Sequence, residues 1–302
     1  MGVLTDSPYA IYGVVDNNFI RHALLFIESL KRSNPGHPPL ILLYHTLLPE
    51  HVATIDQFEN IIAKQIDLSQ FSGCKLTSYV DGKVDAGNYY ARLLLWNPDL
   101  DSYDKIFYVD MDTVVIAPLA DVWKIEEFHI VRDAWASQNF VNDSDPALVA
   151  YLEKLGITGK VEPVNSGAFL LPRKWRTKEE FNLLLKIAAD LNPQLRFAEQ
   201  SALSAWVAAR QMKPSHDYRY NFQFKHFPRT RGLGREFREA IVVHFAGMPD
   251  NLRLKYMAWL TRATDPLRRW LFLFHTFIFK NGIPAINLRY RRLKQKLVGA
   301  RS

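Results

Sequence analysis

Residues 105–123 read KIFYVDMDTVVIAPLADVW, in which one apolar run ends at the triplet Asp110-Met111-Asp112 and a second apolar run follows it. The first run, 105–109, is short and rich in aromatic and β-branched side chains, which predicts a buried strand. In open α/β sheets, ligands bind outside the carboxyl ends of the strands. The sequence therefore predicts a ligand-binding site at Asp110 and Asp112.

Strands and helices alternate on the amino-terminal side of this stretch. Apolar runs predict the strands, and apolar residues three and four positions apart predict the helices. The expected order is strand 10–15, a helix with Ala23, Leu24, Ile27 and Leu30 on one face, strand 40–44, helix 49–58, strand 61–66 and helix 88–96. Such an alternation predicts an α/β fold, a doubly wound sheet with a mainly parallel core.

The carboxyl-terminal side continues the pattern without a visible linker before about residue 260. Strands are expected at 167–171 and 240–245, and helices at 178–191 and 200–210. No internal repeat interrupts these segments, so one large domain is expected to extend to this point.

Composition places the chain among globular proteins. It has 302 residues, of which 48% are hydrophobic and 23% charged, and this excludes collagen, low-complexity disorder and a disulfide scaffold. The single cysteine, Cys74, has no partner for an internal disulfide. The first residues lack a secretory pattern, and the apolar stretch 270–279 is far shorter than the ~20 residues that span a bilayer.

The two aspartates suggest a metal site. On an extended chain, side chains two residues apart share a face, and on a turn both can converge on one cation. Carboxylate oxygens suit Mg²⁺ or Mn²⁺, and such an ion also neutralises diphosphate charge. Taken alone, the triplet is more typical of a solvated turn than of a metal site, so its interpretation depends on the rest of the chain.

Six blocks support the functional interpretation because they occur in one characteristic order. They are VVDNNF (14–19), YYARLLLW (89–96), the stretch 105–123, VNSGAFLLPRKW (164–175), AEQSAL (198–203) and VVHFAG (242–247). In these blocks the chain resembles glycosyltransferase family 8, the retaining transferases of the glycogenin and bacterial lipopolysaccharide galactosyltransferase type. The resemblance implies a GT-A nucleotide-diphospho-sugar transferase fold, with a Rossmann-like central mixed sheet flanked by helices.

The resemblance also implies a metal and donor site. Asp110 and Asp112, with Met111 between them, would hold Mn²⁺ or Mg²⁺ and the donor diphosphate, and His244 would be the third protein ligand. Without the family match, a histidine in the run IVVHFA is more typical of a buried core residue than of a metal ligand. Asp16 and Asn17 match the stretch that contacts the nucleotide base and ribose. Their alternative role is a polar cap on the following helix.

Further matches surround the expected sugar. Arg92 would lie between the metal-site carboxylates and the sugar, where its planar guanidinium holds a carboxylate and orients donor hydroxyls. Asn165 would read sugar hydroxyls with its amide, and Ser166 and Gly167 would bring backbone close to the donor. The last two matches are Glu199 and Gln200, which correspond to an acid and a glutamine near the anomeric carbon. Together with Arg92 they would be the catalytic residues. In the alternative interpretation, Glu199 and Gln200 only form the first turn of a helix.

The block that contains His244 ends at Gly247, which is also assigned to donor binding, and here the chain departs from the family. The family usually has Lys-Pro-Trp after this glycine to clamp the leaving diphosphate, whereas Asp250 stands at the place of the lysine. A carboxylate repels phosphate. The residues that can replace the lysine are Arg253 or Lys255, or a basic residue from elsewhere such as Arg229 or Arg231.

The end of the chain is basic and amphipathic. From Arg262 onward there are ten basic residues and one acid. Asp265-Pro266 is expected to open a helix that ends near Gly282, with apolar residues on one face: Leu267, Trp270, Leu271, Phe274, Phe277 and Ile278. A second segment follows, in which Ile286, Tyr290, Leu293 and Leu297 are opposed by Arg289, Arg291, Arg292, Lys294 and Lys296.

Basic amphipathic helices with aromatic faces lie at membrane interfaces. The expected division is thus a catalytic domain over 1–261 and a membrane-associating tail over 262–302. In the alternative, the apolar faces pack on the catalytic domain or on a partner subunit. No nucleic-acid partner is expected, because no recognised nucleic-acid motif accompanies the charge.

These features predict a metal-dependent retaining glycosyltransferase that moves a hexose, galactose or glucose, from a UDP-sugar to a glycolipid or lipopolysaccharide-like acceptor. Its expected place is the cytoplasmic face of the membrane, as a peripheral protein. One alternative is a non-catalytic membrane or nucleic-acid adaptor with a degenerate transferase fold. Another is a glycogenin-like glucosyltransferase that primes a glycan on protein.

Overall fold

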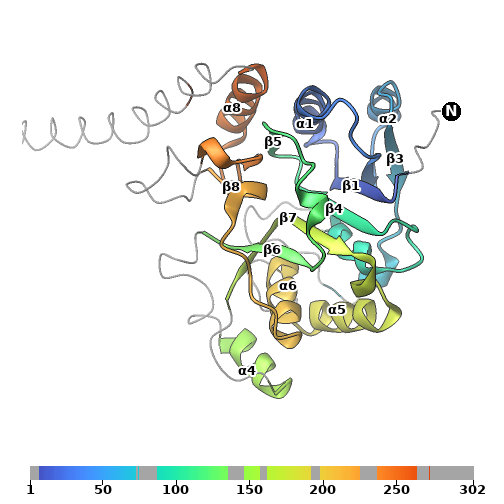
Figure 1. Ribbon diagram of the computed structural model, residues 1–302. Helices are drawn as coiled ribbons and strands as arrows, with labels where there is room; N and C mark the ends of the chain where they lie inside the picture. Colours follow the sequence, from blue (N-terminus) through green and yellow to red (C-terminus); the bar gives the residue numbers. More distant parts are fainter. Residues whose placement is uncertain are drawn as a thin grey trace, which may run out of the picture.

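A six-stranded mixed sheet forms the centre of the computed structural model, which describes residues 7–72, 74, 87–134, 146–156, 162–191, 198–224, 237–263 and 272. The strand order is β3-β2-β1-β4-β7-β6 (Figure 1). The first four strands in this order are parallel, whereas β7 is antiparallel to both β4 and β6. The strands are β1 (Tyr9–Val14), β2 (Leu40–Tyr44), β3 (Ile61–Gln65), β4 (Lys105–Val109), β6 (His129–Arg132) and β7 (Val164–Pro172).

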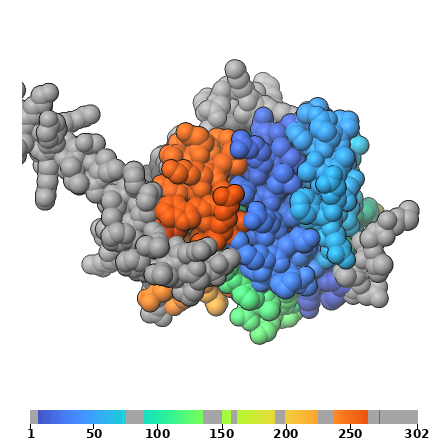
Figure 2. Space-filling model, turned by 90° about the horizontal axis from the view of Figure 1, so that it is seen from above, coloured from blue at the N-terminus to red at the C-terminus, as the bar shows by residue number. Residues whose placement is uncertain are grey.

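Helices cover both faces of this sheet. On one face α1 and α2 lie side by side, with α8 next to α1 (Figures 1 and 2), and on the other face α5 packs against α6. The α-helices are α1 (Ile20–Ser33), α2 (Pro49–Ile55), α3 (Gly87–Ala91), α4 (Pro146–Lys154), α5 (Lys178–Leu191), α6 (Ala198–Ala209) and α8 (Asp250–Arg262). Short 3₁₀ helices are η1 (Ser69–Phe71), η2 (Arg92–Trp96), η3 (Val122–Lys124), η5 (Arg173–Trp175) and η7 (Tyr218–Tyr220). The expected α/β fold with a flanked mixed sheet is confirmed.

Strand β4 shows why an uninterrupted apolar run forms the centre of the sheet. Side chains alternate between the two faces of a strand. Ile106 and Tyr108 are fully buried in the cluster that α5 and α6 cover, and Phe107 and Val109 are fully buried in the cluster that α1 covers. A strand with helices on both faces needs apolar side chains at successive positions, and the sequence 105–109 provides them.

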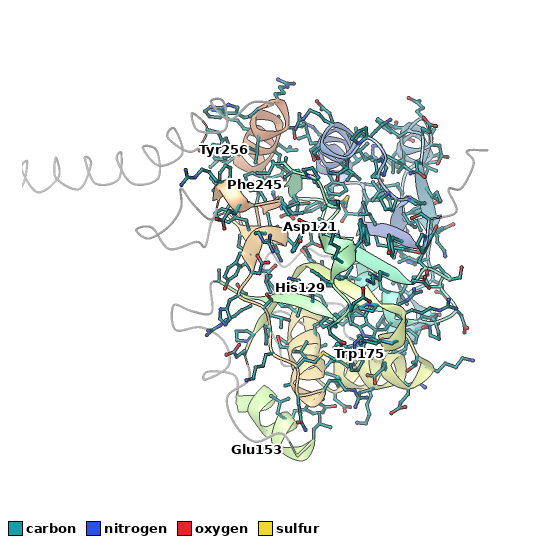
Figure 3. The ribbon with its side chains drawn as sticks, viewed as in Figure 1. Asp121, His129, Glu153, Trp175, Phe245 and Tyr256 are labelled. Carbon is teal, nitrogen blue, oxygen red and sulfur yellow. The ribbon has the colours of Figure 1, made fainter. Side chains whose placement is uncertain are left out.

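A second, three-stranded sheet begins directly after the aspartate pair. Its strands are β5 (Thr113–Val115), β9 (Val242–His244) and β8 (Phe222–Gln223), in the order β5-β9-β8. Figure 3 shows Phe245 and Tyr256 close to this sheet, and both belong to the hydrophobic cluster between the sheet and α8. The sequence predicted the apolar runs of β5 and β9 but not that they form a separate sheet, because their pairing joins distant segments.

Some element boundaries differ from the predictions. The expected helix 88–96 is divided into α3 and the 3₁₀ helix η2, and α2 ends at Ile55 rather than at residue 58. Strand β7 starts at Val164, earlier than the expected 167. Elements α4, β6 and α8 were not predicted; β6 has four residues with polar His129 and Arg132 at its ends, a weak strand signal.

Most of the basic tail lies outside the described residues, and so do Arg229 and Arg231. Phe272 is described and is 0% exposed. Its ring lies 5.4 Å from that of Trp259, 5.5 Å from Phe224, 5.9 Å from Tyr256 and 6.0 Å from Phe237. Aromatic contacts therefore join this part of the chain to the hydrophobic cluster between the small sheet and α8. Within the described ranges, no helix is both long enough and apolar enough to cross a membrane.

Candidate active site

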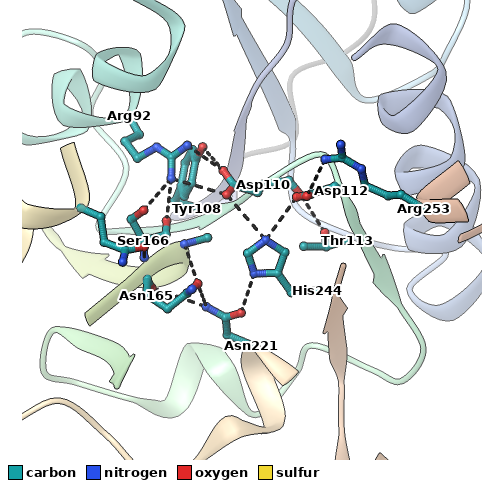
Figure 4. Close-up of polar contacts among 12 residues, drawn as sticks. Arg92, Tyr108, Asp110, Asp112, Thr113, Asn165, Ser166, Asn221, His244 and Arg253 are labelled. Carbon is teal, nitrogen blue, oxygen red and sulfur yellow. Dashed lines mark hydrogen bonds and ion pairs between the residues drawn. The ribbon is translucent and has the colours of Figure 1, made fainter. Parts of the chain in front are cut away.

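The aspartate pair occupies the joint between the two sheets (Figure 4). Asp110 follows β4 of the large sheet, and its backbone N–H donates to the Gly167 carbonyl of β7 at 2.8 Å. Asp112 precedes β5 of the small sheet, and its carbonyl accepts from the Phe245 N–H at 3.0 Å. Hydrogen bonds from both sheets therefore fix the backbone on either side of the turn.

Strand pairing brings His244 to the same joint. Thr113 is opposite His244 in the β5–β9 ladder, so the imidazole emerges beside Asp112. His244 Nε2 lies 3.2 Å from Asp112 Oδ1 and 3.8 Å from Asp110 Oδ2. The three residues offer ligand atoms that all lie within 4.8 Å of one another. Two carboxylates and one imidazole form a donor set that suits Mn²⁺ or Mg²⁺, so the residues fit the expected metal.

The electrostatics of the cluster favour a bound cation. Burial acts to raise the pKa of Asp112, but His244 and Arg253 outweigh burial and lower it. Burial likewise acts to lower the pKa of His244, but the carboxylates of Asp112 and Asp110 outweigh it and leave the pKa raised. The cluster is thus a buried anionic site that stabilises positive charge, whether a proton, an arginine or a metal supplies it.

Arg92 forms the wall of the site beside Asp110. Its guanidinium is buried, with Nη2 3.1 Å from Asp110 Oδ1 and Nη1 donating to Ser166 Oγ at 2.8 Å. Nη1 also lies 3.9 Å from Glu199 Oε1. The Tyr108 hydroxyl donates to Asp110 Oδ1 at 2.6 Å. Asp110 is therefore held by a charged and a neutral donor, and Arg92 connects it to Glu199. The position of Arg92 between metal and sugar stays a prediction.

Glu199 and Gln200 begin α6 and face this wall. Burial raises the pKa of Glu199, and the nearby Arg92 partly opposes that rise. Gln200 Oε1 accepts from the Ser166 N–H at 3.4 Å, while its Nε2 donates to Asp133 Oδ2 at 3.0 Å. The side-chain orientation of Gln200 is thus set from both ends. Asp133 was missed because it follows β6, the short strand that the sequence did not predict.

The side-chain oxygen of Asn165 binds protein groups, whereas the whole amide was expected to be available to the sugar. Its Oδ1 accepts from the Gly167 N–H at 3.1 Å and from Asn221 Nδ2 at 2.9 Å. An amide oxygen has two lone pairs, so these contacts occupy its acceptor capacity. Of the amide that was expected to read sugar hydroxyls, only the NH₂ group remains to donate to a ligand.

Gly167 provides space for the imidazole ring of His244. A Cβ atom built at Gly167 would lie 2.0 Å from Cε1 and 2.6 Å from Nδ1 of His244. The glycine was expected to let backbone approach the donor. The structure shows that its missing side chain is also required by the imidazole ring.

We expect Gly167→Ala to displace His244 and to weaken Mn²⁺ binding at least tenfold, because no imidazole position so close to a Cβ is sterically allowed. The displacement should also lower the stability by about 1–3 kcal/mol, as overpacking does in other cores. Calorimetric Mn²⁺ titration and denaturant unfolding measure the two effects. Gly36→Ala is the matched control, because a Cβ there meets nothing within 4 Å; equal behaviour of the two variants would contradict the role of Gly167.

Asp16 and Asn17 lie after β1, at the same edge of the sheet as Asp110, and both make local contacts. Asp16 Oδ1 accepts from the backbone N–H groups of Asn18 and Phe19 at 2.8 and 2.9 Å. These contacts stabilise the turn before α1, but Asp16 does not cap the helix, because the N-cap residue of α1 is Phe19 and no side-chain hydrogen bond caps it. Asn17 Oδ1 accepts from the Leu48 N–H at 2.9 Å. Their contact with a nucleotide stays a prediction.

Met111 and Gly247 can contribute to the site only through their main-chain atoms. The Met111 side chain is buried in the core beside β1, where a Cβ at Gly13 would lie 2.1 Å from its methyl carbon. It therefore offers only its main chain to a ligand. Gly247 has a φ of 65°, a left-handed conformation that favours glycine. It turns the chain from β9 into α8.

Of the two candidates on α8 for the missing lysine, the structure brings Arg253 to the site. Arg253 Nη1 donates to Asp112 Oδ2 at 3.0 Å, and the guanidinium lies over the Phe19 ring, 5.1 Å from its centroid. Lys255 is exposed on α8. Asp250 is 3.6 Å from Arg253 Nη2 and 3.1 Å from Nε2 of the buried His22. Its carboxylate therefore contacts these two side chains.

A mixed sheet flanked by helices, with a carboxylate pair after its central strand, is the fold of the GT-A glycosyltransferases. A sequence model described as "Glycosyl transferase family 8" matches residues 10–249, and the chain belongs to this family. No curated protein matches the sequence significantly.

Solved structures agree with the fold. The galactosyltransferase LgtC, in complex with donor and acceptor sugar analogues, superposes with a TM-score of 0.63 at 18% identity, over 83% of this chain and 95% of LgtC. GlyE of Streptococcus pneumoniae TIGR4 gives 0.54 at 18% identity, over 85% of this chain and 61% of GlyE. Mouse xyloside xylosyltransferase 1 superposes with a TM-score of 0.52 at 13% identity, over 80% of this chain and 99% of the xylosyltransferase. At these identities the similarity concerns the fold.

Proposed function

We propose that this family 8 glycosyltransferase is a metal-dependent, retaining hexosyltransferase that uses a UDP-sugar and a glycolipid or lipopolysaccharide-like acceptor. The observation that carries the proposal is the cluster of Asp110, Asp112 and His244, whose ligand atoms lie within 4.8 Å of one another at the carboxyl end of β4. Arg92 and Glu199, whose side chains lie 3.9 Å apart, add two charged groups beside this cluster.

Each residue has a role that its position supports. A divalent cation bound at Asp110, Asp112 and His244 would neutralise the leaving diphosphate as its negative charge grows. Arg92 holds the Asp110 side chain in place, because its guanidinium lies 3.1 Å from that carboxylate. Gln200, held by Ser166 and Asp133, faces the sugar and stabilises the positive charge at its anomeric carbon. The acceptor hydroxyl attacks from the face that the diphosphate leaves, which gives retention.

The donor sugar is proposed to be galactose or glucose, with LgtC, a galactosyltransferase of similar fold, as support. A glycogenin-like enzyme would use the same donor site with a protein acceptor. A non-catalytic adaptor is disfavoured, because a degenerate site has no need of two carboxylates and a histidine with a glycine that makes room for the ring.

A panel of nucleotide sugars tests the proposal. Purified protein should hydrolyse or transfer one UDP-hexose in the presence of Mn²⁺ or Mg²⁺, and EDTA should remove this activity. Product stereochemistry, read by NMR of the anomeric proton, should show retention. Binding of no nucleotide sugar with either metal would contradict the enzyme assignment, and inversion would contradict the attack geometry.

Arg253 is proposed to replace the missing lysine at the diphosphate. We expect Arg253→Gln to weaken UDP binding about tenfold or more, because hydrogen bonds to charged groups contribute about 1.5–3 kcal/mol. The effect should appear as a higher donor KM and a higher Kd for UDP. Lys255→Gln removes an exposed charge from the same helix and should leave both constants unchanged; equal losses in the two variants would point to a general charge effect instead.

The basic tail is proposed to attach the enzyme to anionic lipid at the cytoplasmic membrane face. Because Phe272 is buried against Tyr256 and Trp259, a chain that ends at Asp265 also loses a core contact. We expect that truncation to destabilise the domain by about 3 kcal/mol, as removal of a buried phenylalanine does. Phe272→Ala in the full chain should have a similar effect, measured by denaturant unfolding.

A chain that ends at Lys280 separates attachment from stability. It keeps Phe272 but lacks the six most carboxyl-terminal basic residues. We expect it to hydrolyse UDP-sugar normally and to sediment less with anionic liposomes, since each basic residue near the surface contributes about 1 kcal/mol. Sedimentation that equals that of the full chain would contradict the membrane role of the segment after Lys280.

A further inference from the structure

A buried asparagine that belongs to none of the six sequence blocks contacts the proposed metal ligand. Asn221 lies between η7 and β8 and is 0% exposed. Its Oδ1 is 2.9 Å from His244 Nδ1, and its Nδ2 is 2.9 Å from Asn165 Oδ1 (Figure 4). One amide thus connects the imidazole to the start of β7.

The hydrogen-bond network determines which way this amide points. The chain of contacts ends at the Gly167 backbone N–H, which donates to Asn165 Oδ1. Because that atom is an oxygen, Asn221 must present its NH₂ group to it, and its own oxygen then faces His244 Nδ1. A carbonyl oxygen only accepts, so Nδ1 carries the proton.

This proton assignment leaves the other nitrogen for the metal. In the neutral ring Nε2 then has the free lone pair, and Nε2 is the atom that lies 3.2 Å from Asp112 Oδ1 and 3.8 Å from Asp110 Oδ2. On the opposite side, Gly167 gives the ring just enough room, because a Cβ there would lie 2.0 Å from Cε1. Both the tautomer and the ring orientation are set by protein groups.

We propose that Asn221 is a positioning residue, which holds His244 in the Nδ1–H tautomer with Nε2 directed at the cation between Asp110 and Asp112. The inference rests on the proposed metal site. It adds Asn221 to the residues of that site, as a residue that affects metal binding through His244. Removal of such a partner of a metal-bound histidine typically weakens metal affinity about 10–100-fold.

Gln223 offers a matched control for a variant of Asn221. It is another fully buried amide, two residues further on, in β8. Its side chain accepts from the Ala134 N–H at 3.0 Å and donates to the Arg132 carbonyl at 3.2 Å, and neither contact involves His244. Asn221→Leu and Gln223→Leu therefore each remove one buried amide of the same strand region. Gln223 pairs with His244 through the backbone of the β8–β9 ladder, but only the Asn221 side chain hydrogen-bonds to the imidazole.

The experiment measures the tautomer and the metal affinity separately. ¹⁵N NMR of histidine-labelled protein at alkaline pH, with the signal assigned through His244→Gln, should show the Nδ1–H form in the wild-type protein and in Gln223→Leu. Asn221→Leu should lose this preference, and its calorimetric Kd for Mn²⁺ should rise about 10–100-fold. The wild-type tautomer needs no variant, so the test stands even if Asn221→Leu does not fold.

Three results would overturn the inference: a wild-type Nε2–H tautomer, an unchanged tautomer and Mn²⁺ Kd in Asn221→Leu, or an equal rise of the Kd in Gln223→Leu. Failure of the wild-type protein to bind Mn²⁺ would instead contradict the proposed function. The tautomer measurement, made without metal, tests the effect of Asn221 on His244 in either case.

Discussion

Asp112→Asn is expected to lower metal-dependent turnover on the order of a thousandfold, because a metal ion contributes several kcal/mol to stabilising the leaving group. Asp112 is buried, 3.2 Å from His244 Nε2 and 3.0 Å from Arg253 Nη1, so the amide removes an anionic ligand without a change of shape. Steady-state turnover of the UDP-sugar at saturating Mn²⁺ measures the loss.

The control for this variant is Asp121→Asn, which changes an exposed aspartate paired with Lys124 at 2.8 Å. Surface ion pairs of this kind contribute about 0–1 kcal/mol, so turnover should be unchanged. Near wild-type turnover in Asp112→Asn, with the fold confirmed by circular dichroism, would show that Asp112 is not a metal ligand.

Arg92→Leu is expected to lower both the stability of the fold and the turnover. Removal of one partner of a buried ion pair costs about 3–5 kcal/mol, and we expect about 3 kcal/mol because the Asp110 side chain is still 21% exposed. Turnover should also fall more than a hundredfold, since Asp110 and Glu199 lose the guanidinium between them. Denaturant unfolding and UDP-sugar turnover measure the two losses.

Arg92→Lys separates charge from shape at this position. An ammonium preserves the positive charge but lacks the planar arrangement of donors that reaches Asp110 and Ser166 together. We expect a smaller loss of stability than in Arg92→Leu but a clear loss of turnover. If both variants unfold like the wild-type protein, the buried pair with Asp110 does not stabilise the fold.

The central strand and the position of the aspartate pair were predictable because both signals are local. Five successive apolar side chains at 105–109 identify a strand buried on both faces, and a polar triplet directly after such a strand marks the ligand edge of an α/β sheet. The structure confirms the strand and brings both carboxylates together.

The proposed third metal ligand could not be assigned from local sequence alone. His244 lies in an apolar run, where a core histidine and a metal ligand look alike, and only the ladder between β5 and β9 brings it beside Asp112. The family resemblance identified His244 because it transfers long-range pairing that the sequence pattern does not contain.

Asn221 and Asp133 show a second limit of sequence reasoning. Both are single polar residues next to strands of two and four residues, which give almost no periodic signal. Their contacts, with His244 and with Gln200, exist only after several distant segments have packed together. Residues that orient the matched side chains are therefore found from the structure, whereas the matched residues themselves stand in recognisable blocks.

The most direct test of the central claim is calorimetric titration of UDP into the wild-type protein with Mn²⁺ and with EDTA. We expect Mn²⁺ to tighten UDP binding at least tenfold, and we expect this gain to disappear in Asp112→Asn. UDP binding that is equally tight in EDTA, or a gain that survives in Asp112→Asn, would contradict a diphosphate-bearing metal site at Asp110, Asp112 and His244.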